Sequence, residues 1–194
     1  MNQILEEISN IGVVPVVAID HKYDAAPLAD ALTKGGLPCA EVTFRTPAAE
    51  ESIRIMADQF PDMLLGAGTV LTTEQADRAI AAGAKFIVSP GFNPKVVSHC
   101  IEKNIPITPG ISNPSDMGLD AVKFFPAVPS GGLSMIKALA APYHTMRFMP
   151  TGGVTPQNLT EFLDYPKILA CGGTWMVKPE LLATGNFEEI TRLT

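Results

Sequence analysis

The sequence contains few charged residues, few cysteines and no long apolar run. Charged side chains make up 18% of the 194 residues, and the net charge of −6 comes without a basic stretch that would suit nucleic acid. No apolar segment approaches the roughly 18–20 residues of a transmembrane helix, and the N-terminus carries acids where a signal peptide carries lysines. Cys39, Cys100 and Cys171 are odd in number and lack CxxC spacing, which disfavours disulfides. We therefore expect a cytoplasmic protein that binds neither nucleic acid nor membranes.

The three histidines also lack a metal-binding pattern. His21, His99 and His144 lie far apart in the chain, and none has HxH or HExxH spacing. His99 falls within a helical pattern, so we expect it on an outer helix. The sequence therefore predicts no metal site.

Strand-like and helix-like segments alternate along the chain. Apolar runs recur at intervals of roughly 20–25 residues, each followed by glycine or polar residues and then a helical pattern. The strands predicted in this way span residues 13–19, 39–45, 63–70, 84–90, 105–110, 120–127, 146–153 and 167–175. Such alternation favours a parallel sheet with right-handed crossovers. About eight units in this length fit an α/β protein with one (β/α)8 TIM barrel domain over residues 1–194, with a doubly wound open sheet as the alternative.

Two of the connecting segments read clearly as helices, and one connection is unusually short. Residues 46–60 and 72–83 open with Thr46 and Thr72 as candidate N-caps and carry acids early. Between the fifth and sixth strands, residues 111–119 leave less room than the roughly 10–12 residues that a crossover with its helix requires. We expect the outer helix at this point to be shortened or missing.

Alternation within two strands places charged side chains on one face. Glu41 and Arg45 share a face of the strand at 39–45, and Lys123 lies opposite Val122 and Phe124 in the strand at 120–127. In a barrel, the apolar face packs against the helices, so these charges point inward, where a structural ion network is one interpretation. All three lie toward the C-terminal ends of their strands, where barrel active sites are built, and this favours a catalytic interpretation.

Lys123 is the candidate nucleophile of such a site. Burial and a neighbouring cation favour the uncharged form of a lysine, and an uncharged amine can attack a carbonyl carbon.

Two glycine pairs follow the last two predicted strands. Residues 152–153 and 172–173 are both Gly-Gly, a sequence that lets backbone N–H groups converge on an anion. The loops after the final two strands of a barrel are the usual phosphate site, so the pairs predict phosphate binding. The GAGT at residues 66–69 is ambiguous: Thr69 supplies a hydroxyl, or the glycines ease strand packing.

Seven strings, in order, resemble one family over nearly the whole chain: EVTFRTP, GAGTVLT, FIVSPGFNP, ITPGISNPSDM, VKFFPA, MPTGGV and ACGGTWMV. They are similar to those of the class I 2-keto-3-deoxy-6-phosphogluconate (KDPG) aldolases, a family that also handles 4-hydroxy-2-oxoglutarate (KHG). The resemblance implies a (β/α)8 barrel that works as a homotrimer. It also implies cleavage of a phosphorylated keto acid to pyruvate and glyceraldehyde 3-phosphate, without a metal or other cofactor.

The resemblance also implies roles for individual residues. Lys123 is similar to the Schiff-base lysine, Glu41 to the acid/base residue, and Arg45 with Thr69 to the clamp for the pyruvate carboxylate. The implied pocket residues are Pro90, Phe125 and Thr151, and the implied phosphate-binding residues are Gly152, Gly153, Gly172, Gly173 and Thr174.

The chain also departs from the family. Members carry roughly six more residues before the strand of Lys123, enough for the fifth outer helix. This departure motivates an alternative, a catalytically impaired barrel that serves as a scaffold or binding protein. A third hypothesis, a phosphate-binding isomerase, keeps the glycine loops but leaves Lys123 without a covalent task.

Overall fold

The computed structural model describes residues 2–111 and 119–194. Within these ranges it contains eight strands: β1 (Val13–Val17), β2 (Cys39–Thr43), β3 (Leu64–Gly68), β4 (Phe86–Ser89), β5 (Ile107–Ile111), β6 (Ala121–Phe124), β7 (Arg147–Pro150) and β8 (Cys171–Gly173). Neighbouring strands pair in parallel in the order β7-β6-β5-β4-β3-β2-β1-β8. β7 and β8 meet through two isolated parallel bridges, Phe148 with Ile168 and Thr151 with Gly172. The sheet is a nearly closed barrel, which confirms the (β/α)8 prediction over the open sheet.

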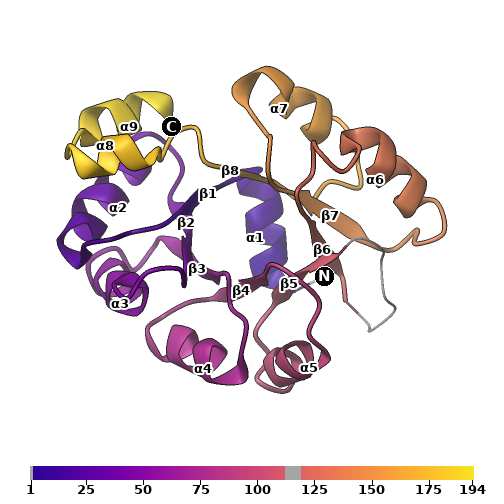
Figure 1. Ribbon diagram of the computed structural model, residues 1–194, viewed down its shortest axis with the longest axis horizontal. Helices are drawn as coiled ribbons and strands as arrows, with labels where there is room; N and C mark the ends of the chain where they lie inside the picture. The colour runs from indigo at the N-terminus through magenta and orange to yellow at the C-terminus, as the bar shows by residue number, and fades with distance from the viewer. Residues whose placement is uncertain (1, 112–118) are drawn as a thin grey trace.

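Helices α2 to α9 surround this ring of strands, and α1 lies across its opening (Figure 1). They are α1 (Gln3–Ile11), the 3-10 helix η1 (Lys22–Asp24), α2 (Ala25–Lys34), α3 (Ala49–Gln59), α4 (Thr73–Ala81), α5 (Pro94–Glu102), α6 (Gly132–Ala140), α7 (Pro156–Leu163), α8 (Pro179–Ala183) and α9 (Phe187–Leu193). Within the described ranges, none of them is long and apolar enough to cross a membrane. The predicted shortening of the helix between β5 and β6 concerns residues 112–118, which lie outside the described residues.

The first helix closes one end of the barrel. In Figure 1, α1 crosses the opening of the ring. Its buried residues Leu5 and Ile8 belong to one apolar cluster with side chains of the barrel interior, including Val14, Phe86 and Met149. Asn2 caps the helix by accepting a hydrogen bond from the N–H of Ile4 at 2.9 Å. Because α1 packs against this cluster, the N-terminal half of the barrel interior is an apolar core.

The predicted inward and outward faces of β2 and β6 are confirmed. Ala40 and Val42 of β2 pack in the outer apolar layer with the helices, while Cys39 lies in the inner cluster. On β6, Val122 and Phe124 pack in a second outer layer with α6 and α7. Lys123, between them, therefore points into the barrel.

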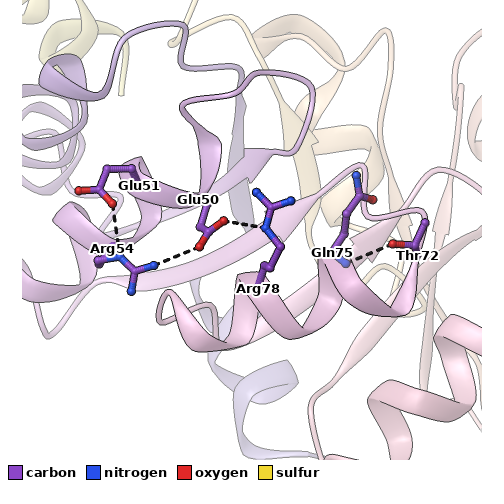
Figure 2. Close-up of polar contacts among 6 residues, drawn as sticks. All are labelled: Glu50, Glu51, Arg54, Thr72, Gln75 and Arg78. Atoms are coloured by element: carbon purple, nitrogen blue, oxygen red, sulfur yellow. Dashed lines mark hydrogen bonds and ion pairs between the residues drawn. The ribbon is translucent and has the colours of Figure 1, made fainter.

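Polar contacts on the surface join α3 to α4 (Figure 2). Glu50 accepts hydrogen bonds from Arg54 Nη2 at 3.1 Å and from Arg78 Nε at 2.7 Å, so one carboxylate spans both helices. Thr72 caps α4 by accepting from the N–H of Gln75 at 3.2 Å, as predicted. Only the Glu50–Arg78 ion pair among these contacts joins the two helices, and because both side chains are partly exposed it stabilises their packing only modestly.

The predicted capping role of Thr46 is wrong. α3 begins at Ala49, with Ala48 at the N-cap position and no side-chain capping bond. The Thr46 hydroxyl donates instead to the carbonyl of Ile19 in the loop after β1. A threonine before a helical pattern predicts a cap only when no other acceptor competes for it, and here the adjacent loop supplies one.

Candidate active site

A cavity of about 150 Å³ lies at the C-terminal mouth of the barrel. Its walls come from residues at or just after the ends of the strands, where a barrel places its functional groups. Ten of the twelve residues predicted from the sequence line it: Arg45, Thr69, Pro90, Lys123, Phe125, Thr151, Gly152, Gly153, Gly172 and Thr174. The remaining two are Glu41, which contacts Lys123 directly, and Gly173.

Lys123 and Glu41 form a buried ion pair at the base of this cavity. Lys123 Nζ lies 3.0 Å from Glu41 Oε1 and 3.4 Å from Oε2, although the two residues are 82 positions apart in the chain. Lys123 is 7% exposed and Glu41 is 1% exposed, so water scarcely reaches either group. Of the three inward charges predicted from the sequence, the Glu41 carboxylate contacts Lys123, and Arg45 lines the same cavity. A carboxylate at this distance can take a proton from the ammonium and return it.

Arg45 and Thr69 lie next to each other on the wall formed by β2 and β3. Arg45 Nε donates a hydrogen bond to Thr69 Oγ1 at 3.1 Å. Thr69 has a φ of 57°, a left-handed conformation that is rare for a β-branched residue and is typical of strained functional positions. This bond uses the Nε–H of the guanidinium, and the other N–H groups can bind a carboxylate in a bidentate manner.

Phe125 and Pro90 form part of the apolar wall of this cavity. The ring centroid of Phe125 lies 5.8 Å from Lys123 Nζ, within the range of a cation–π contact. Pro90 follows β4, where Ser89 Oγ donates to the Gly91 carbonyl at 2.9 Å and fixes the turn. An apolar wall keeps the ammonium and any covalent product that it forms away from bulk water.

The glycine loop after β7 is held by its carbonyl groups. The carbonyls of Thr151, Gly152 and Gly153 accept hydrogen bonds from Ala127 N at 2.8 Å, Val128 N at 3.0 Å and Asn158 Nδ2 at 3.0 Å. Gly152 and Gly153 have φ values of 91° and 80°, which explains the need for glycine at both positions. Among the described residues, the buried Thr151 hydroxyl has no hydrogen-bond partner, so a polar group remains available at the cavity wall.

The two glycines of β8 face opposite ways. Gly172 pairs with Val14 of the inner cluster and lines the cavity, where a Cβ atom would overlap Thr151 Oγ1. Gly173 points the other way, and a Cβ atom there would overlap the ring of Trp175. Gly173 therefore faces Trp175 and not the cavity.

The sequence did not reveal two further wall residues, Val16 and Val154. Val16 lies on β1, which is apolar on both faces, so alternation carried no information about which valines point inward. Val154 follows the glycine loop and belongs to no alternating strand pattern, so the sequence did not show which way its side chain points.

Other candidates from the sequence lie away from the cavity. His99 lies on the outer helix α5, as predicted, and its Nε2 lies 2.8 Å from Asp77 Oδ1. Among the described residues, no three His, Cys, Asp or Glu side chains cluster in a way that could hold a metal ion.

The three cysteines are free, buried and unreactive in character. Burial raises the pKa of the Cys39 and Cys171 thiols to about 12 and that of Cys100 to about 11, with Glu7 and Asp77 adding to the shift at Cys39 and Cys100 respectively. A thiol must ionise to act as a nucleophile, so none of the three competes with Lys123 at neutral pH.

The Lys123–Glu41 pair lies inside the C-terminal mouth of a parallel (β/α)8 barrel. Enzymes with this fold carry out their chemistry at that end, among the loops that follow the strands, so the site places the chain in the class of barrel enzymes. The model of the family described as "KDPG and KHG aldolase" matches residues 4–193. The chain belongs to this family of aldolases and is a lyase.

Individual members of this family are similar to the chain over nearly their whole length. The 2-dehydro-3-deoxy-phosphogluconate aldolase of Treponema pallidum is 50% identical over 200 residues, covering 100% of this chain and 95% of the relative. The enzyme of the same name from Haemophilus influenzae is 49% identical, covering 98% of this chain and 93% of the relative. The KDPG aldolase of Legionella pneumophila, solved with pyruvate captured at low pH as a covalent carbinolamine intermediate, is 38% identical. That structure superimposes with a TM-score of 0.94, covering 99% of this chain and 96% of the other.

Proposed function

We propose that this chain is a Schiff-base aldolase that cleaves 2-keto-3-deoxy-6-phosphogluconate to pyruvate and glyceraldehyde 3-phosphate. The observation that carries the proposal is the buried Lys123–Glu41 pair at the base of the cavity, with Nζ and Oε1 3.0 Å apart. A lysine that is sequestered from water and touches a proton acceptor can become a nucleophile without leaving its place. Membership of the family makes a scaffold role the weaker alternative.

The first half of the reaction joins substrate to protein. Glu41 takes a proton from the Lys123 ammonium, and the free amine attacks C2 of the keto acid to form a carbinolamine. Glu41 then returns its proton to the departing hydroxyl, and loss of water leaves a cationic iminium on Lys123. The carbinolamine captured with pyruvate in the Legionella pneumophila relative supports the first of these steps.

The second half breaks the carbon–carbon bond. Glu41, again a carboxylate, takes the proton of the C4 hydroxyl through a water molecule. The C3–C4 bond then breaks, its electrons move into the iminium to give an enamine, and the aldehyde leaves. Glu41 returns the proton taken from the C4 hydroxyl to C3 of the enamine, and addition of water to the regenerated iminium releases pyruvate and restores the amine. The iminium serves as the electron sink, so this route uses Lys123, Glu41 and water.

The proposed contacts hold the two ends of the substrate. Arg45 and Thr69 bind the carboxylate beside C2, Thr151 contacts the keto acid, and Pro90 and Phe125 form the pocket wall. The substrate phosphate is assigned to Gly152, Gly153, Gly172, Gly173 and Thr174, as residues of the two final loops. We propose 4-hydroxy-2-oxoglutarate as a second substrate because it presents the same 2-keto acid to Lys123. In support, a relative from Escherichia coli that is 40% identical is named KHG/KDPG aldolase.

Trapping with pyruvate tests the proposal. Borohydride added in the presence of pyruvate should reduce the iminium, and peptide mass spectrometry should find the adduct on Lys123. Lys123→Arg keeps a cation beside Glu41 but cannot form the adduct, whereas Lys137→Arg, on the outer helix α6, should label as the parent protein does. An unlabelled parent protein, or a label that persists in Lys123→Arg, would contradict the proposal. Release of pyruvate from KDPG, measured in parallel, separates an active aldolase from a scaffold.

We further infer that residues 1–194 act as one barrel domain in the cytoplasm and assemble as a homotrimer. Three free, buried cysteines are in keeping with a reducing compartment. Phe125, Val128 and Met135 are 40%, 43% and 43% exposed, and exposed apolar side chains of this size favour a subunit interface. The net charge of −6 disfavours nucleic acid as a partner. A small anionic substrate must therefore be bound by a local site such as this cavity. Light scattering tests the trimer.

A further inference from the structure

Gly68 ends β3 directly beside the Glu41 side chain. Strands β2 and β3 pair in register, with Glu41 opposite Gly66 and Thr43 opposite Gly68. The Glu41 side chain lies over the Cα atom of Gly68. A Cβ atom built on Gly68 would be 2.7 Å from Cγ and 2.8 Å from Cδ of Glu41, and nearer still to Oε1. Apart from the chain neighbours of Gly68, the three heavy atoms nearest to such a Cβ atom all belong to Glu41.

The backbone itself does not call for glycine at this position. Gly68 is not among the glycines with positive φ, so an ordinary L-residue could adopt its conformation. The strand cannot easily retreat either, because the Gly68 carbonyl accepts a hydrogen bond from Phe44 N at 2.7 Å. The absent side chain is therefore explained by the space that Glu41 occupies.

We propose that Gly68 is a positioning residue that holds the Glu41 carboxylate against Lys123 by leaving free the volume that this carboxylate occupies. The proposal rests on the acid/base role of Glu41 given above. Any side chain at position 68 would push Oε1 away from its place 3.0 Å from Lys123 Nζ. Because the displaced atoms are the far end of one side chain, the barrel can stay folded while the proton transfers fail.

Gly66 provides a matched control on the same strand. A Cβ atom there would overlap the ring of Phe86, which belongs to the apolar core of the barrel interior, and not Glu41. Gly66→Ala therefore disturbs the core, and Gly68→Ala disturbs the proton-transferring group.

A double-mutant cycle tests the proposal through stability alone. Gly68→Ala should lower the Tm by roughly 5 °C, the loss expected for overpacking one methyl group in a chain of this size. In a Glu41→Ala background, where the volume is empty, the same change should lower the Tm by no more than about 1 °C. Gly66→Ala should lower it equally in both backgrounds. Equal losses from Gly68→Ala in both backgrounds overturn the proposal. If Gly68→Ala fails to fold, folding of the double variant supports the proposal, and failure of the double variant where Glu41→Ala alone folds overturns it.

Kinetics separate positioning from a merely structural effect. Gly68→Ala should lower kcat by about 100-fold, toward the value of Glu41→Gln, because general acid–base catalysis is lost. Its KM should stay within about threefold, since Arg45 and Thr69 are untouched. A Gly68→Ala protein with the kcat of the parent overturns the proposal. If the parent protein itself traps no pyruvate while the stability coupling persists, the proposed function fails and the geometric assignment of Gly68 stands.

Discussion

Removing the Lys123 ammonium should destabilise the barrel more than most single substitutions. Lys123→Met leaves the Glu41 carboxylate, which is 1% exposed, without its partner at 3.0 Å. Breaking a buried ion pair on one side costs about 3–5 kcal/mol, because the remaining charge stays desolvated and unpaired. In a chain of this length each kcal/mol shifts the Tm by roughly 2–4 °C, so the Tm should fall by roughly 6–20 °C.

The double variant Lys123→Met with Glu41→Leu isolates the reason for this loss. Replacing both ions by apolar side chains of similar volume removes the unpaired charge, so its Tm should return to the parent value or exceed it. Thermal and urea unfolding followed by circular dichroism measure both variants. A Lys123→Met protein within about 0.5 kcal/mol of the parent would refute the reasoning, since surface substitutions have effects of that size. A stable but inactive double variant would show that the pair serves chemistry at the expense of stability.

Three further predictions concern the cavity wall and the buried thiols. Thr69→Gly should change the Tm by less than about 3 °C, because relief of the strained φ offsets the greater freedom of glycine in the unfolded chain, while the KM for KDPG rises about tenfold. Arg45→Lys should raise that KM by a similar factor with a smaller effect on kcat, because a single ammonium replaces a bidentate fork; unchanged steady-state kinetics in either variant would contradict the clamp. Cys39, Cys100 and Cys171 should resist a thiol reagent at pH 8 in the folded protein and react in urea. Their raised pKa values also predict that stability is constant below the ordinary thiol pKa of 9.0 and falls as the pH rises from there toward about 12, because only the unfolded thiols ionise in that range. Urea unfolding at pH 7, 9 and 10 checks the sign.

The sequence was most informative where a strand has one polar face. The alternation of residues on β2 and β6 correctly predicted that Ala40 and Val122 face the helices. It therefore also predicted that Glu41 and Lys123 point into the barrel. It could not show that these two side chains touch, because their contact depends on how two strands far apart in the chain are tilted within a closed barrel. For the same reason it could not show which of the inward charges, Glu41 or Arg45, is the direct partner of Lys123; the structure shows that it is Glu41.

Features that depend on shape escaped prediction. On the fully apolar β1, both faces are buried and no pattern distinguishes Val16, which lines the cavity, from its neighbours. The glycines of β3 looked ambiguous because glycine spacing does not show which side chain lies above each Cα atom. Thr46 carried a capping signal, but its hydroxyl binds the Ile19 carbonyl, a partner that only the folded chain brings near.

The incomplete pairing of β7 with β8 has a consequence for how the barrel responds to substrate. Among the residues that the structure describes, β7 and β8 meet through two isolated bridges, and one of them, Thr151 with Gly172, lies at the cavity wall. Local opening is easiest where backbone pairing is sparse, so amides along this edge, such as the N–H of Leu169, should exchange with deuterated solvent faster than those between β2 and β3. A phosphate bound by both final loops would connect β7 to β8, so exchange of these amides should be slower with ligand bound than without it.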